Sequence, residues 1–193
     1  VLRDIPGLVI ASPGHPSDAA PMLRACVAAA ATDGTVCAFL EPIALYHTRD
    51  LHDAGDGVWT APYAGPGEWP TSHVPIGEGR LVRDGHDVLI VTWANGLFLS
   101  LRAARRLAAE GVSCRVFDLR WLAPMPIEQV LAHADELGRV LVVDETRRSG
   151  GVGEGVIAGL VEAGAMVRHA AHLPRACARQ RAEMAVRAPS FPA

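Results

Sequence analysis

The chain has 193 residues, of which 50% are hydrophobic and 20% charged, and this balance is typical of a globular protein. Its formal net charge of -3 argues against a nucleic-acid binder, because such proteins concentrate Lys and Arg on one strongly positive surface. The length suits one full domain plus part of another, and no apolar run approaches the roughly 20 residues of a membrane span. We therefore expect neither a nucleic acid nor a membrane among its partners.

The cysteines indicate the compartment. Four are present, none forms a CxxC pair, and three lie inside apolar runs, where free Cys behaves as a small core residue. This pattern favours a reducing cytoplasm over a disulfide framework. The first residues lack the charged and apolar regions of an export signal. They also begin without Met and run almost at once into an apolar segment, so we expect an upstream portion.

The first 48 residues predict one βαβ unit. A short apolar strand is expected from Leu8 to Ala11, and a second from Val36 to Leu40. Between them a helix opens at Pro16 and Asp18, because proline is tolerated in the first turn and an acidic group is favoured there. The helix ends at Asp33-Gly34. A lone βαβ unit leaves strand edges and apolar faces uncovered, so it needs partner strands from elsewhere.

Residues 41–79 are punctuated by Pro and Gly without a sustained period, which predicts an interdomain connection with some order. Trp59, Tyr63 and Trp69 are expected to lie on a neighbouring surface, because large aromatic side chains in a loop usually cover something.

From Gly79 onward, strands alternate with helices, and this order predicts a mainly parallel sheet covered on both faces. Strands are expected at Arg80–Arg83, Asp87–Thr92, Ser113–Leu119 and Val140–Val143, with an edge strand at Val167–Ala171. Helices are expected after Asn95-Gly96, at Ile127–Leu137, at Gly153–Ala163 and at the terminal Arg175–Arg187.

Acidic residues stand where two of these strands end. Asp144-Glu145 follows one strand, and Asp118 with Arg120 follows its neighbour. Open α/β sheets place ligands at the carboxyl ends of strands, so these acids are candidates for a base, for an ion pair, or for hydrogen bonding to loop amides. Structural hydrogen bonding is the favoured interpretation.

A glycine-rich run, Gly150 to Gly155, follows a strand and opens a helix. Its amides are a candidate anion or partner site, helped by Arg147 and Arg148. The run is not a GxGxxG motif, because position 156 is Val. A tight strand-to-helix turn with close packing is therefore favoured.

Histidines offer little chemistry. His47, His52 and Asp53 lie in the loop at a spacing unusual for zinc ligands, with no second cluster to complete a site. His169 and His172 fall in or beside the expected edge strand, where residues three apart point to opposite faces, and they are expected at a surface. No nucleophile elbow or phosphate-loop lysine is present. The residues thus predict a fold and candidate surfaces, but no complete catalytic set.

Five segments, in order and spacing, resemble one family. They are GLVIASPGHPSDA, FLEPIALYH, VPIGEGRLVRDGHDVLIVTW, EGVSCRVFDLRWLAPMP and VLVVDETRRSGGVG. The chain is similar, over roughly residues 7–161, to the β subunit, or the β half of a fused chain, of the thiamine-diphosphate-dependent decarboxylating component of 2-oxo acid dehydrogenase complexes. This family lies in the transketolase-like superfamily.

The resemblance implies an α/β protein. Residues 1–48 would be the C-terminal remnant of a pyrimidine-binding domain, in the form of its last βαβ unit, and residues 49–75 an interdomain linker. Residues 76–193 would form a three-layer α/β/α transketolase C-terminal-like domain with a mainly parallel sheet.

The resemblance also implies where cofactors bind. Thiamine diphosphate and Mg²⁺ would belong to the complete enzyme, with the activating glutamate and the active-site histidine upstream, so no catalytic or cofactor-binding residue is assigned here. Related β subunits hold a structural K⁺ on backbone carbonyls, which maps to Ala30, Ala31 and Asp33, with Thr35 as a further candidate. Carbonyls at a helix end carry partial negative charge. An ordinary helix stop at Asp33-Gly34 is the alternative.

By this resemblance, the whole enzyme would decarboxylate a 2-oxo acid and pass the acyl group to a lipoyl arm, and this chain would supply dimer and subunit contacts. Its partners would be an α subunit or α half, a second β copy and a lipoyl acyltransferase core. After Gly164 the chain is shorter and more basic than the family pattern, which puts docking to that core in doubt. Alternatives are a stand-alone interaction or oligomerisation module, or a fragment of a transketolase or deoxyxylulose-phosphate synthase relative.

Overall fold

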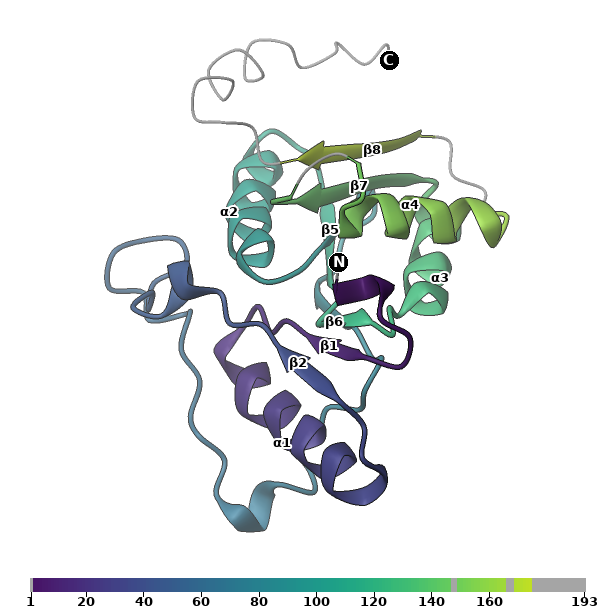
Figure 1. Ribbon diagram of the computed structural model, residues 1–193. Helices are drawn as coiled ribbons and strands as arrows, with labels where there is room; N and C mark the ends of the chain where they lie inside the picture. Colours follow the sequence, from purple (N-terminus) through teal and green to yellow (C-terminus); the bar gives the residue numbers. More distant parts are fainter. Residues whose placement is uncertain (1, 147–148, 166–168, 175–193) are drawn as a thin grey trace.

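The computed structural model describes residues 2–146, 149–165 and 169–174, the last segment by its backbone. Two sheets lie one above the other in Figure 1. The elements of the first are β1 (Val9–Ala11), α1 (Pro16–Asp33), β2 (Cys37–Phe39) and β6 (Trp121–Ala123). The elements of the second are β3 (Arg80–Arg83), β4 (Val88–Thr92), α2 (Asn95–Ala109), β5 (Cys114–Asp118), α3 (Ile127–Leu137), β7 (Arg139–Asp144), α4 (Val152–Glu162) and β8 (His169–Pro174). Short 3-10 helices are η1 (Leu2–Asp4), η2 (Ile43–Leu45) and η3 (Pro66–Glu68).

The larger sheet has the order β3-β5-β4-β7-β8, and all its pairs are parallel except β3 with β5. Strand β3 thus pairs with β5 and not with β4, which follows it in the chain. The connection between them crosses the start of β5 so closely that a Cβ on Gly85 would come within 2.3 Å of the Cys114 carbonyl carbon. Glycine is therefore required at this crossing.

Helices cover both faces of the larger sheet. In Figure 1, α2 lies on one side, and α3 and α4 on the other. Because side chains alternate along a strand, Ile90 packs against Leu97 of α2, whereas Val91 packs with Val130 of α3 and Val156 of α4. The predicted three-layer α/β/α arrangement is confirmed.

The smaller sheet has the order β2-β1-β6. Strands β1 and β2 are parallel with α1 between them, as expected for the βαβ unit. The third strand, β6, runs antiparallel to β1 and comes from the second half of the chain. It supplies a partner strand that the βαβ unit needs. The sequence does not predict β6, because its three residues are too few to show the alternation of apolar and polar side chains that marks a strand.

The loop between the two halves is ordered by its aromatic residues. Trp59 is 1% exposed and meets Phe98 of α2 edge-on, with ring centroids 5.1 Å apart. Trp69 lies under the guanidinium of Arg24, 5.1 Å from ring centroid to Cζ. Trp59 covers a neighbouring surface as predicted. Trp69 lies against α1 through Arg24 but is 39% exposed, and Tyr63 is 72% exposed and does not cover a surface.

Most element bounds agree with the sequence predictions within one or two residues, and α3 agrees at both ends. Strand β8 begins two residues later than predicted and continues to Pro174, pairing in parallel with β7. The terminal helix predicted at 175–187 lies outside the described residues. None of the helices in the described part of the chain combines the length and hydropathy that a membrane crossing needs.

Candidate functional site

A pocket of about 210 Å³ opens at the carboxyl ends of β1 and β2, where parallel sheets commonly place ligands. One wall is the turn from β1 into α1, a second is the segment after β2, and a third is Trp59 from the loop. The lining residues are Pro13, Gly14, His15, Pro16, Ala19, Phe39, Glu41, Pro42, Leu45, Tyr46 and Trp59.

His15 in this pocket is held in place. Its Nδ1 accepts the backbone N–H of Ser17 at 3.2 Å, which caps α1, and its ring meets Trp59 edge-on at 4.8 Å. Because Nδ1 accepts, the proton of the neutral ring lies on Nε2, and the ring is also hydrogen-bonded to the backbone of Val58. Burial, with a smaller contribution from Arg80, lowers the pKa of His15. The imidazole is therefore a neutral, fixed wall of the pocket.

The polar part of the opposite wall is acidic. The hydroxyl of Tyr46 donates to Oε2 of Glu41 at 2.5 Å, and this hydrogen bond raises the pKa of Tyr46. None of the described residues that line the pocket is Lys or Arg. The wall therefore suits an uncharged or cationic group, and its described lining offers a phosphate no Lys or Arg side chain.

Beside the pocket, a buried ion cluster joins the two sheets. Asp18 of α1 is 2% exposed, and its carboxylate accepts from Nη2 of Arg120 at 2.6 Å and from Nη1 of Arg80 at 3.2 Å. Arg80 also donates to the Ser17 hydroxyl at 2.9 Å. The acid comes from the smaller sheet and the two arginines come from the chain around β3, β5 and β6. We call Asp18, Arg80, Asp118 and Arg120 the interface cluster.

Asp118 is the fully buried member of this cluster. Its Oδ1 accepts the backbone N–H of Arg120 at 3.1 Å, while Oδ2 has no hydrogen-bond partner among the described residues. A Cβ on Gly14 would come within 3.1 Å of that oxygen, so the pocket turn closes directly over it. Burial raises the pKa of Asp118 to about 7. Sequence reasoning selected Asp118 and Arg120, but their partner Asp18 was seen only as a helix-start residue.

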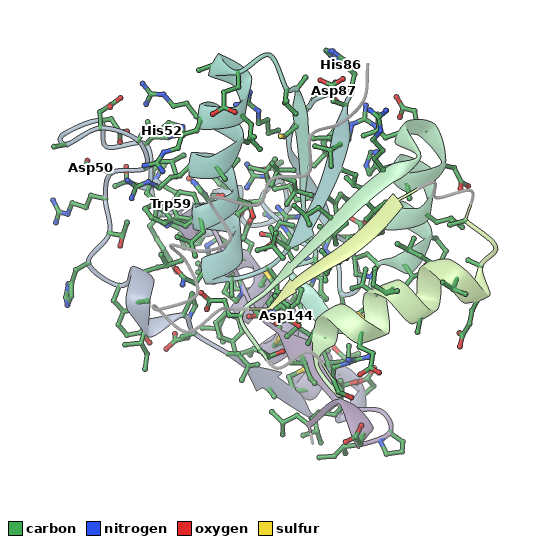
Figure 2. The ribbon with its side chains drawn as sticks, turned by 90° about the horizontal axis from the view of Figure 1, so that it is seen from above. Asp50, His52, Trp59, His86, Asp87 and Asp144 are labelled. Atoms are coloured by element: carbon green, nitrogen blue, oxygen red, sulfur yellow. The ribbon has the colours of Figure 1, made fainter. Side chains whose placement is uncertain are left out.

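Asp144 and Glu145 act as structural acceptors. Asp144 is 2% exposed, and its two oxygens accept the backbone N–H groups of Thr146 at 2.7 Å and Gly153 at 2.8 Å. Figure 2 shows Asp144 at the end of β7, next to the start of α4. Glu145 accepts from the side-chain amide of Asn95 at 2.5 Å. The favoured interpretation, hydrogen bonding to loop amides, is what the structure shows for Asp144.

Backbone groups of the glycine-rich run are hydrogen-bonded to other residues of the chain. The N–H of Gly150 goes to the Glu154 carboxylate, and Arg3 donates to the carbonyl of Gly151 at 3.0 Å. A Cβ on Gly155 would approach the Arg3 guanidinium to 2.3 Å, so this glycine allows close packing. These contacts agree with the predicted packing turn. Arg147 and Arg148 lie outside the described residues.

The candidate metal histidines are not brought together. No group of three His, Cys, Asp or Glu side chains suited to a metal occurs in the described part of the chain. Asp53 instead pairs with Arg105 of α2 at 2.6 Å, and the backbone N–H of His52 goes to Asp56. Figure 2 shows His52 in the loop beside α2. For His169 and His172 the structure describes only the backbone, in β8.

The end of α1 holds the candidate K⁺ ligands. Gly34 has a φ of 77° and donates its N–H to the carbonyl of Ala30 at 3.2 Å. Asp33 accepts from the backbone N–H of Thr35 at 2.9 Å, and from its hydroxyl, which lowers the pKa of Asp33. The helix is thus closed by a left-handed glycine, as an ordinary helix stop would be. The carbonyl oxygens of this last turn keep lone pairs that a cation could use.

The α/β/α sheet, the βαβ unit beside it and the pocket at the strand ends define a protein with the transketolase-like fold. A solved structure described as a split gene transketolase, inactive beta4 tetramer, superposes with a TM-score of 0.66 at 22% identity, over 90% of this chain and 49% of that one. The family described as transketolase, C-terminal domain, matches residues 77–189, more than half of the chain. The chain belongs to this family.

Curated relatives agree. The beta subunit of acetoin:2,6-dichlorophenolindophenol oxidoreductase from Cupriavidus necator is 33% identical over 73% of this chain and 36% of its own length. The pyruvate dehydrogenase E1 component subunit beta of Staphylococcus aureus is 31% identical over 84% of the chain and 44% of its length. 1-Deoxy-D-xylulose-5-phosphate synthase of Gloeobacter violaceus is 35% identical over 86% of this chain and 23% of its own length. The chain therefore spans less than half the length of each.

Proposed function

We propose that this chain is the C-terminal part of a thiamine-diphosphate-dependent enzyme that decarboxylates a 2-oxo acid and transfers the acyl group to a lipoyl carrier. Two of the relatives named above support an oxidoreductase β subunit, and the third supports a sugar-phosphate synthase. The observation that carries the proposal is the match of residues 77–189 to the transketolase C-terminal family, together with the two oxidoreductase beta-subunit relatives.

The described residues do not form a complete site for thiamine diphosphate and Mg²⁺. The described pocket lining has no basic side chain for a diphosphate, and no three-acid group for Mg²⁺ occurs among the described residues. We therefore assign the cofactor to an α subunit or α half and to residues upstream. This chain would contribute the pocket wall, held by the interface cluster, and contacts between subunits.

The proposed domain organisation has three parts. Residues 1–48 complete a pyrimidine-binding domain, residues 49–75 link it, and residues 76–193 form the C-terminal domain. The proposed partners are an α part, a second β copy and a lipoyl acyltransferase core, all in the cytoplasm. A solved relative is described as an inactive beta4 tetramer, which favours self-association of the isolated chain without activity.

Binding calorimetry tests this assignment. The isolated chain, titrated with thiamine diphosphate in the presence of Mg²⁺, should show no more than weak binding, because the groups that would hold the diphosphate lie elsewhere. Tight binding would overturn the proposal that the cofactor is held by residues outside this chain. Assays of the whole protein with pyruvate, branched-chain 2-oxo acids and sugar phosphates then separate the two substrate classes. Turnover of sugar phosphates alone would refute the 2-oxo acid assignment.

We also propose that the carbonyls of Ala30 and Ala31 and the Asp33 residue bind a structural K⁺. The support is their position in the last turn of α1, where helix carbonyls carry partial negative charge. A thermal unfolding midpoint that is higher in KCl than in choline chloride or NaCl of equal strength is the expected result. Equal unfolding midpoints in the three salts would contradict the proposal that K⁺ binds there.

A further inference from the structure

Helix α1 and strand β2 bring two cysteines together. At helical spacing, Met22, Ala25 and Cys26 face the smaller sheet, where they are buried. At the spacing of a strand, Cys37 and Phe39 face α1 and pack against the same cluster. The two periods therefore place Cys26 and Cys37 in the same layer of side chains, between the helix and the edge strand.

The two cysteines are neighbours. Sγ of Cys37 lies 3.7 Å from the carbonyl oxygen of Cys26, and Cys37 is close enough to contribute to the raised pKa of Cys26. Sγ of Cys37 is also 4.0 Å from the carbonyl oxygen of Thr35. Both cysteines are free thiols. Burial and the adjacent Cys37 raise the pKa of Cys26 to about 12, so Cys26 on its own is a poor nucleophile.

The two thiols differ in access. Cys26 is 4% exposed, whereas Cys37 is only partly buried. Strand β2 is the edge of the smaller sheet, and within the described residues its outer side has no paired strand. A small oxidant can therefore reach Cys37, with Cys26 directly behind it. Cys114, the third described cysteine, is 0% exposed in the core and offers a matched contrast.

We propose that Cys26 and Cys37 are a reversible dithiol–disulfide pair that closes in the presence of a hydroperoxide. The Cys37 thiolate attacks the peroxide, so an S–O bond forms, the O–O bond breaks, and water or an alcohol leaves with the thiol proton. The sulfur of Cys26 then attacks the sulfenic acid of Cys37. An S–S bond forms, the S–O bond breaks, and the Cys26 proton leaves in a second water molecule.

The disulfide would link the middle of α1 to β2. The two residues are 11 positions apart, and the loop between them contains the helix stop at Asp33-Gly34. Beyond β2 the chain leads to Glu41 and Tyr46 in the pocket wall. Oxidation would thus fix the strand from which this wall extends, and a thiol reductant would release it.

The test uses the full chain with Cys114→Ala and Cys177→Ser, beside the unaltered chain, because these changes leave only the pair. Each folded protein is treated with hydrogen peroxide, denatured, alkylated and weighed. The expected product lacks two hydrogen atoms and takes up no alkyl group at the pair. Trypsin leaves both cysteines on the peptide 25–49, and cleavage before Asp33 then gives two fragments that only a disulfide holds together.

A second variant, Cys26→Ser, separates a pair from two independent thiols. With its resolving partner gone, Cys37 should remain as a sulfenic acid that dimedone traps, or oxidise further to the sulfinic acid. Oxidation of the pair should also raise the thermal midpoint, and dithiothreitol should return it to the starting value. Two alkylatable thiols after peroxide treatment of a chain with native circular dichroism would overturn the proposal. Equal dimedone trapping with and without Cys26 would do the same.

Discussion

Two ion networks in this molecule use the same groups in opposite surroundings. Arg115 at the start of β5 is 7% exposed. Each nitrogen of its guanidinium donates to a carboxylate, Nε to Asp84 at 2.9 Å and the two Nη atoms to Glu136 at 2.6 and 3.1 Å. Its two carboxylate partners are 75% and 60% exposed. In the interface cluster the acids are the buried groups, and both Asp118 Oδ2 and Arg120 Nε lack a partner among the described residues.

The difference shows that the burial of the charged groups, more than the number of ion pairs, decides how each network responds to a change of charge. The Arg115 network leaves its negative charges hydrated, so only one charge is desolvated. The interface cluster desolvates two acids beside the pocket, and one of them holds its proton to about pH 7. The first network fastens a sheet to a helix, and the second makes the contact between the two sheets sensitive to charge.

The largest expected loss of stability is at Asp18. Asp18→Ala would leave Arg120, whose side chain is 12% exposed, without its strong partner. Removing one member of a buried pair costs about 3 to 5 kcal/mol. We expect the free energy of unfolding in urea to fall by about 3 kcal/mol. Asp53→Ala, which breaks the solvent-exposed pair with Arg105, is the matched control and should change little. Equal effects would contradict the comparison.

A smaller loss is expected at Arg115. Arg115→Met keeps the buried stem and removes the charge, and the exposed Asp84 and Glu136 carboxylates can return to water. The loss should be about 1 to 2 kcal/mol, measured by the same urea titration. A loss larger than that of Asp18→Ala would mean that burial of the acids is not what separates the two networks.

At Asp118 a gain of stability is expected, and it depends on pH. Its folded pKa of about 7 lies above the unfolded value of about 3.9, so its contribution to stability is full below pH 4 and is lost as pH rises toward 7. Asp118→Asn keeps the acceptor for Arg120 and cannot ionise. The variant should therefore be more stable than the original chain at pH 8, by at most about 4 kcal/mol, the free energy of a shift of about 3 pKa units, and should gain nothing near pH 4.

His15 acts in the opposite direction. Its pKa is lowered by burial, so its contribution is lost as pH falls below about 6.5. Comparing the variant with the original chain at each pH cancels this term. A gain for Asp118→Asn that is the same at pH 4 and pH 8 would show that the carboxyl does not titrate in this range.

The sequence predicted most of the fold, because its helices and buried strands have clear periods. Helix α3 was placed at Ile127–Leu137, where an apolar stripe lies between Pro126 and Gly138. Strand β6 was missed because Trp121–Ala123 is too short to show a period. Its partner β1 lies more than a hundred residues away, and no local signal indicates such a pairing.

The candidate site was only half predictable. The rule that ligands gather at strand ends selected Asp118 and Arg120, and both lie in the interface cluster. Asp18 belongs to the same cluster, but in the sequence it is only an acidic residue in a first helical turn. The pocket wall at Trp59 comes from an irregular loop, and loop geometry has no sequence period.

Strand β6 also decides how the protein responds to a protease. Trp121 belongs to the second half of the chain, yet it is fully buried with Met22 of α1 and Val74 in one core cluster. A cut in the exposed loop near Tyr63 would break the covalent link between the halves but not this shared core. A nicked chain would therefore still migrate as one particle under native conditions and separate into two fragments only after denaturation.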